Sequence, residues 1–247
     1  MRVLAYTITR AHTPARGKLL LETLTRGRET ADHDFDWHVY CNGATLARSI
    51  CESALATKII NGSEYTPINE GQHPPSNRAI AKAIDEGYDY LLRIDDDVEW
   101  LSKRWLAKLV DASHKLGDKM VLSPLVRGLR WQPPQSQAIQ IEGVPIRIVD
   151  GPIGGICRFT PVGLFKSKPY VSDVRWPMGG GDAVGFGKWA IESKPLFYLA
   201  YCQHIRIRHA KSTDGQEIED PQHFDDHDIF QHVPYIPLWA PDEKPSS

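Results

Sequence analysis

Apolar positions in the first half of the chain alternate between short runs and stretches with a helical period. Val3–Thr9 is an apolar run typical of a buried strand, and the leucines after it share one helical face that we expect to end near Gly27. Four more strands are predicted in this half, at Trp37–Cys41, Thr57–Ile60, Tyr90–Ile94 and Met120–Val126. Strands that alternate with helices predict βαβ units and a mostly parallel sheet.

Two further helices are predicted where a serine precedes an apolar helical period. Ser76 is expected to cap one of them, and Ser102 to cap another that closes at Gly117. The strand Tyr90–Ile94 runs directly into three aspartates, Asp95–Asp97. Because ligands of parallel sheets bind beyond the carboxyl ends of the strands, these aspartates lie where a ligand is expected.

The second half of the chain has a different pattern. Residues 127–155 are rich in Pro, Gly and Gln and show little helical period, whereas Gly154–Thr160 and Leu196–His209 are predicted strands. From Thr213 onward the chain is polar, acidic and histidine-bearing, which is typical of a loosely ordered tail. The pattern therefore divides the chain after residues 126 and 212.

Composition and charge narrow the classes of function. The net charge of −2 gives no overall field that would recruit nucleic acid or an anionic membrane. No apolar stretch approaches the roughly 20 residues needed to cross a bilayer, so we expect a soluble, cytoplasmic protein without a membrane span. The four cysteines form no CxxC pair, which argues against a disulfide scaffold or a structural zinc site.

Three adjacent aspartates after a buried strand are costly to hold together, because their charges repel one another. A divalent cation with oxygen ligands removes this repulsion, and a metal that bridges two phosphates is a common reason for such a run. The alternative is a solvated loop or the first turn of a helix, where acidic residues are also favoured.

The segment Tyr90–Asp97 resembles the DxD strand end of family 2-like glycosyltransferases with the GT-A fold. Ser76–Ala79 resembles the helix that this family places before that strand, and Val3–Arg10 resembles its first nucleotide-contacting strand. Tyr40–Gly43 is similar to its Asp-Asn-Gly turn, with Cys41 in place of the first acid. The four segments keep the family's order within roughly residues 1–210.

This resemblance implies an α/β fold of the GT-A type, Rossmann-like, with a mostly parallel central sheet and helices on both faces. It implies a single domain in which residues 1–126 bind a nucleotide sugar, residues 127–212 form a smaller acceptor-binding and catalytic half, and residues 213–247 are a polar tail. Asp97 would bind the metal directly, and Asp95 the ribose or the metal. The other implied donor contacts are Thr7, Thr9, Arg10, Asn42, Asn77, Arg78 and Asp96.

Transfer with inversion needs a carboxylate that takes the proton of the acceptor hydroxyl. Asp182 resembles the catalytic acid of the family's Glu-Asp motif, with Gly181 in place of the Glu; the alternative is a helix N-cap. Gly180 and Gly181 would let the acceptor approach closely. Trp176 is the candidate for stacking on a sugar, and a core position is the alternative.

GT-A enzymes often complete their metal site with a histidine from a late strand, so the resemblance implies that His209 binds Mn²⁺ or Mg²⁺. His204 is the alternative, and alternation along the strand would turn the two histidines to opposite faces. His223 and His227 have the i, i+4 spacing of a helical metal site, but a solvated C-terminal face accounts for them better.

The sequence therefore predicts a metal-dependent glycosyltransferase of the hexosyltransferase kind, which moves a sugar from a nucleotide sugar, UDP-linked by resemblance, to an acceptor hydroxyl with inversion. The alternatives are a nucleotidyltransferase acting on sugar phosphates and a non-catalytic nucleotide-sugar-binding module. The acceptor could be a polysaccharide, a lipid, a protein or a modified DNA base. A DNA acceptor would need a basic track, for which the candidates are Arg127, Arg130, Arg147, Arg158, Lys166 and Lys168.

Overall fold

The computed structural model describes residues 1–127, 136–149, 153, 156–170, 186, 189 and 198–210. Its strands are β1 (Val3–Thr9), β2 (Asp36–Asn42), β3 (Gly62–Thr66), β4 (Tyr90–Ile94), β5 (Val98–Trp100), β6 (Met120–Arg127), β7 (Ile139–Ile141), β8 (Val144–Val149), β9 (Cys157–Pro161) and β10 (Tyr198–His209). Its helices are α1 (Pro14–Thr30), α2 (Thr45–Ala56), α3 (His73–Asp85), α4 (Trp105–Leu116) and α5 (Val162–Ser167).

All described strands belong to one sheet in the order β3-β2-β1-β4-β9-β6-β10-β8-β7, with β5 paired to β10 outside this path. Strands β3, β2, β1 and β4 are parallel. Strand β9 is antiparallel to both β4 and β6, so these two run in the same direction, and β10 is parallel to β6. The predicted mostly parallel sheet is confirmed, with β9 as a reversed strand in its middle.

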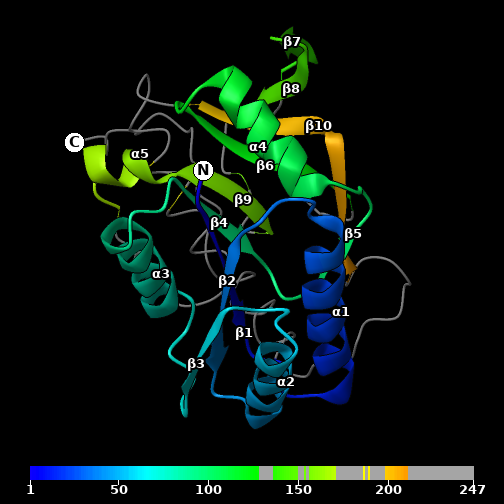
Figure 1. Ribbon diagram of the computed structural model, residues 1–247, viewed down its shortest axis with the longest axis vertical. Coiled ribbons are helices and arrows are strands. Elements are labelled where there is room, and N and C mark those ends of the chain that lie inside the picture. The colour runs from blue at the N-terminus through cyan, green and yellow to red at the C-terminus, as the bar shows by residue number, and fades with distance from the viewer. Residues whose placement is uncertain are drawn as a thin grey trace, which may run out of the picture.

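Helices cover both faces of the sheet (Figure 1). Helices α1, α2 and α4 lie on one side, where Trp105 of α4 donates a hydrogen bond to the carbonyl of Gly27 in α1 at 3.0 Å. Helices α3 and α5 lie on the opposite side, as Figure 1 shows. We call the two sides the α1 face and the α3 face. No described helix is long and apolar enough to cross a membrane.

Several predicted boundaries differ from the structure. Helix α1 continues through Gly27 to Thr30. Gly27 permits close packing and does not end the helix: an added Cβ would lie 2.7 Å from Cη2 of Trp37. The strand predicted at Thr57–Ile60 is wrong. Thr57 caps α2, a helix that the sequence analysis missed, and Lys58 takes a left-handed φ of 59°.

The two serines predicted as helix caps have other roles. Helix α3 begins at His73 with prolines in its first turn, so Ser76 lies inside the helix, where it is buried. Helix α4 begins only at Trp105, and Ser102 Oγ instead accepts a hydrogen bond from the backbone N–H of Arg206 at 2.8 Å. Ser102 thus fastens the start of α4 to β10.

Candidate active site at the acidic turn

The three aspartates that follow β4 form the acidic turn, Asp95–Asp97, and they point to two sides. Asp95 keeps 31% of its side chain exposed and accepts a hydrogen bond from Arg93 Nη2 at 3.2 Å. Asp96 and Asp97 are buried and pair with a cation from α1. The turn therefore does not present three equivalent carboxylates to a ligand.

Arg16 is the cation that pairs with the two buried aspartates. Its Nη2 lies 2.6 Å from Asp96 Oδ1, and its Nη1 lies 3.0 Å from Asp97 Oδ2. Burial alone lowers the pKa of Arg16, but the charges and hydrogen bonds of the two carboxylates outweigh it and raise this pKa above its ordinary value. The guanidinium therefore stays charged, and its planar fork suits two acceptors at once.

Arg16 is not among the predicted site residues, although the sequence carries a signal for it. Thr13 caps α1 and accepts a hydrogen bond from the backbone N–H of Arg16 at 3.2 Å, and Pro14 opens the helix. The first turn of a helix that directly follows β1 lies at the carboxyl end of the parallel sheet. A basic residue in that turn is thus placed beside the acidic turn.

Two threonines hold the acidic turn in place. Thr9 Oγ1 donates a hydrogen bond to Asp96 Oδ2 at 2.6 Å, so this predicted donor contact acts on the turn itself. Thr23 Oγ1 accepts from the backbone N–H of Val98 at 3.0 Å and lies 3.2 Å from the Val98 carbonyl. The turn is thereby fixed from β1 and from α1 before any ligand binds.

Strand β5 brings His209 to the acidic turn. It pairs antiparallel with β10 so that His209 lies opposite Val98, and the backbone N–H of Ala210 donates to the Asp97 carbonyl at 2.9 Å. His209 Nε2 then lies 3.4 Å from Asp97 Oδ2. His204 lies elsewhere, near charged groups of α4, and burial lowers its pKa.

Asp97 and His209 fit two positions of a divalent ion. Two ligand atoms at about 2.1 Å from an ion and at a right angle lie about 3 Å apart, close to the distance between Asp97 Oδ2 and His209 Nε2. Among the described residues, no group of three His, Cys, Asp or Glu side chains could hold a metal. Further ligands would therefore come from phosphate oxygens and water, as is usual for Mg²⁺.

The remaining predicted donor contacts have varied surroundings. Thr7 is fully buried and accepts a hydrogen bond from Trp37 Nε1 at 3.0 Å, which leaves it no open surface. Asn42 holds the following loop: its Nδ2 donates to the Gly71 carbonyl at 2.7 Å, and its Oδ1 accepts from the Glu70 N–H at 2.8 Å. Arg10 is half-buried after β1.

On α3, Arg78 pairs with two acids. Its Nε lies 2.9 Å from Glu64 Oε1, its other nitrogens donate to Glu70, and its guanidinium lies over the ring of Tyr40. Asn77, beside it, is half-buried. These contacts hold Arg78 beside β2 and β3.

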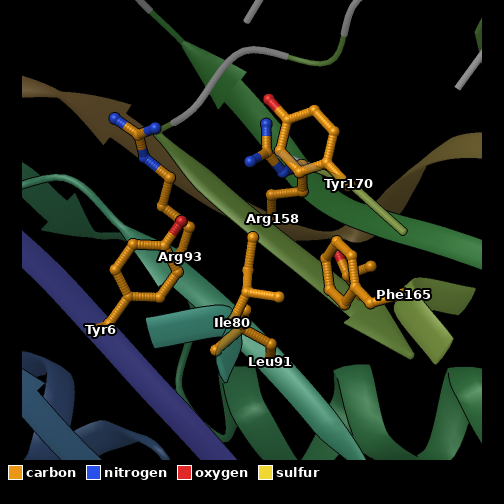
Figure 2. A pocket seen from close by; sticks show the side chains of 8 residues that line it. Tyr6, Ile80, Leu91, Arg93, Arg158, Phe165 and Tyr170 are labelled. Atoms are coloured by element: carbon orange, nitrogen blue, oxygen red, sulfur yellow. The ribbon is translucent and has the colours of Figure 1, made fainter. Parts of the chain in front are cut away.

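A second basic group lies on the α3 face of the sheet. Tyr6, Arg93 and Arg158 are direct neighbours across β1, β4 and β9, and they line a small cavity together with Tyr170 (Figure 2). Both arginines are buried, and burial lowers the pKa of Arg158 to about 10. The guanidinium carbon Cζ of Arg158 lies 3.6 Å from the centre of the Phe186 ring.

This burial corrects one expectation from the sequence. Arg158 is 4% exposed and cannot belong to a surface track for a DNA backbone. Arg127 and Lys166 are exposed, but they lie on β6 and α5, separate elements of the fold. Arg130 lies outside the described residues. The same holds for the four predicted acceptor-side residues, which are Trp176, Gly180, Gly181 and Asp182.

No protein-family model matches the chain, and no curated protein matches it in sequence. Solved structures match its fold. TarS 1–349 of S. aureus with UDP-GlcNAc has a TM-score of 0.57 and 12% identity over 87% of this chain and 62% of that one. The mannosyltransferase PcManGT of Pyrobaculum calidifontis with GDP-Man and Mn²⁺ has a TM-score of 0.60 and 12% identity, covering 86% and 58%.

GalNAc-T7 with UDP, GalNAc and Mn²⁺ has a TM-score of 0.58 and 10% identity, covering 85% of this chain and 44% of that one. The chain thus spans less than two thirds of the length of each of these three proteins. All three have the GT-A fold, and the expected fold class is confirmed for this chain. At such low identity the likeness establishes the fold, while the chemistry must be argued from the site.

Proposed function

We propose that the protein is a metal-dependent glycosyltransferase that moves a sugar from a nucleotide sugar to an acceptor hydroxyl. The observation that carries this proposal is the distance of 3.4 Å between Asp97 Oδ2 and His209 Nε2 at the carboxyl end of β4. Asp97 directly precedes β5, and His209 ends β10, the strand that pairs with β5. Structures of the same fold contain UDP-GlcNAc, or GDP-Man with Mn²⁺, which supports a nucleotide-sugar donor and a divalent ion here.

In this proposal Asp97 and His209 hold Mn²⁺ or Mg²⁺, which neutralises the diphosphate leaving group when bound. Asp95 is the carboxylate with an exposed edge, and Arg93 orients it through the 3.2 Å hydrogen bond. It is therefore suited to accept hydrogen bonds from the hydroxyls of the donor. UDP remains our proposed nucleotide, on the resemblance of the first strand and the acidic turn.

The acceptor side of the proposal rests on sequence. Asp182 would take the proton of the acceptor hydroxyl in an inverting transfer, with Trp176, Gly180 and Gly181 around the acceptor. The burial of Arg158 removes one support for a DNA acceptor. A hydroxyl-bearing polysaccharide, lipid or protein is the acceptor class that we retain.

The first prediction concerns donor and metal. Incubation with a panel of UDP- and GDP-sugars should release the nucleoside diphosphate slowly by hydrolysis, and Mn²⁺ should support this better than Mg²⁺. Excess chelator should stop the release, and added Mn²⁺ should restore it. Full activity in chelator would remove the metal from the proposal, and release of pyrophosphate from a nucleoside triphosphate and a sugar phosphate would identify a nucleotidyltransferase instead.

The second prediction separates donor binding from chemistry. Asp182→Asn keeps the shape of the side chain but removes the proton acceptor, so turnover should fall by roughly 10²–10⁴-fold. Binding of UDP, measured by titration calorimetry, should change little. A variant that unfolds more easily and binds UDP poorly would show that Asp182 is a helix cap.

A further inference from the structure

One oxygen of the acidic turn lies beside both a guanidinium and an imidazole. Asp97 Oδ2 accepts the hydrogen bond of Arg16 Nη1 at 3.0 Å, and the same oxygen lies 3.4 Å from His209 Nε2. The oxygen that would bind a divalent ion together with His209 is thus already paired with a guanidinium. Both carboxylates held by Arg16 are buried, so water screens these charges weakly.

The other half of the guanidinium is anchored independently. Arg16 Nη2 lies 2.6 Å from Asp96 Oδ1, and Asp96 Oδ2 is held in turn by Thr9 Oγ1 at 2.6 Å. Helix α1 keeps the arginine near the turn through its cap at Thr13. Arg16 can therefore give up Asp97 without leaving the site, because Asp96 still holds its other nitrogen.

A divalent ion bound to Asp97 and His209 would lie within a few ångströms of this fixed positive charge. Two cations at that separation in a weakly screened site repel strongly, so Arg16 must weaken the binding of the ion by itself. A diphosphate would change the balance, because its negative charges would attract both cations, and its oxygens are good acceptors for a guanidinium.

We propose that Arg16 is a built-in counter-cation of the acidic turn, which holds Asp97 in the absence of metal and releases it when a divalent ion arrives with a diphosphate. This inference rests on the proposed function, since it takes Asp97 and His209 as the ligands. It makes metal and nucleotide bind in a mutually dependent way. Each then raises the affinity for the other by the same factor.

The test is a titration with Mn²⁺, in which electron paramagnetic resonance counts the free ion, without and with UDP. Wild-type protein should bind Mn²⁺ weakly alone and at least about tenfold more tightly with UDP, within the usual range of such couplings. Arg16→Gln should bind Mn²⁺ about tenfold or more tightly without UDP, because the repelling charge is gone. Arg16→Lys keeps the charge and should stay near wild type.

Two further variants complete the test: one for the case that Arg16→Gln unfolds the protein, and one as a control. Arg16→Gln leaves two buried carboxylates without their cation and could unfold the protein. The double variant Arg16→Gln/Asp96→Asn removes one charge of each sign and leaves Asp97, His209 and Thr9 in place. Because the Arg16 guanidinium no longer competes for Asp97 Oδ2, this variant should also bind Mn²⁺ more tightly than wild type, although by less than Arg16→Gln. Arg48→Gln, in an exposed pair with Glu52 on α2, is the control and should leave the titration unchanged.

Two results would overturn the inference: variants without the Arg16 charge that bind Mn²⁺ no more tightly than wild type, or a wild-type affinity for Mn²⁺ that UDP does not change. Failure of the proposed function is recognised separately, by the absence of nucleotide-sugar hydrolysis with every metal and donor tried. The Mn²⁺ comparison decides the role of Arg16 in either case.

Discussion

At the scale of single residues, the candidate site is a chain of polar contacts that runs from Thr9 through Asp96, Arg16 and Asp97 to His209. Each link is a contact of 3.4 Å or less. Because these groups are largely buried, removing one takes a buried contact from its neighbour, which costs more than the loss of an exposed ion pair. The effect of a substitution here should therefore extend beyond the residue that is changed.

His209→Ala should lower the affinity for Mn²⁺ by about tenfold or more in the presence of UDP, and high Mn²⁺ should partly restore turnover, because Asp97 remains as a ligand. His209→Asp should keep part of the activity, since oxygen ligands also suit Mn²⁺. The control is His204→Ala, which changes a histidine near α4. If His204→Ala weakened Mn²⁺ binding and His209→Ala did not, His204 would be the metal ligand instead.

At the scale of elements, the packing of α1 against the sheet fixes the position of the acidic turn. Gly27 lets α1 approach Trp37 and Trp100, and Trp100 Nε1 donates to the Thr23 carbonyl at 3.0 Å. Trp100 belongs to β5, the strand that follows the acidic turn and pairs with β10. A side chain at position 27 would push α1 away from both the turn and its partner strand.

Gly27→Ala should therefore destabilise the protein by about 1–3 kcal/mol, the usual cost of overpacking a core. Its new Cβ would lie 2.7 Å from Trp37 and 3.0 Å from Trp100. Gly163→Ala in α5 is the matched control, because nothing lies within 4 Å of its Cβ position and alanine favours a helix. Urea unfolding of both variants measures the difference, and equal midpoints would contradict this account of Gly27.

At the scale of the whole molecule, the sheet crosses the boundary that the sequence places after residue 126. Strand β9 lies between β4 and β6, and β10 lies on the other side of β6. Both neighbours of β6 thus come from the second part of the chain. The division into a donor half and an acceptor half describes proposed roles, while the sheet forms a single unit.

A fragment of residues 1–126 should consequently fail to fold into a stable structure, because β6 would lack both neighbouring strands and β4 would expose an unpaired edge. Its urea unfolding curve and its amide proton spectrum should lack the cooperativity and dispersion of the whole chain. A sharply cooperative transition for the fragment would show instead that the first part is an independent domain.

Local pattern determined much of this structure. The apolar runs at Val3–Thr9 and Tyr90–Ile94 match β1 and β4 residue for residue, because a strand buried on both faces leaves a continuous apolar signal. The aspartates that directly follow the apolar run of β4 indicated the candidate site, because ligands of parallel sheets bind beyond the carboxyl ends of the strands. The GT-A fold class followed from segments in a fixed order. Helix α2 was missed because its buried face consists of the small residues Ala47, Cys51 and Ala54, which give little apolar signal.

Only the tertiary structure decided which charges meet. Arg16 and Asp97 are 81 residues apart in the sequence, and their contact depends on α1 packing beside β5. His209 reaches the turn through the pairing of β5 with β10, and β10 carries an irregularity between Cys202 and Arg206 that simple alternation does not predict. The burial of Thr7 likewise follows from Trp37 on the adjacent strand. Sequence patterns report which face of an element is apolar, whereas ion pairs between distant segments depend on how those elements pack.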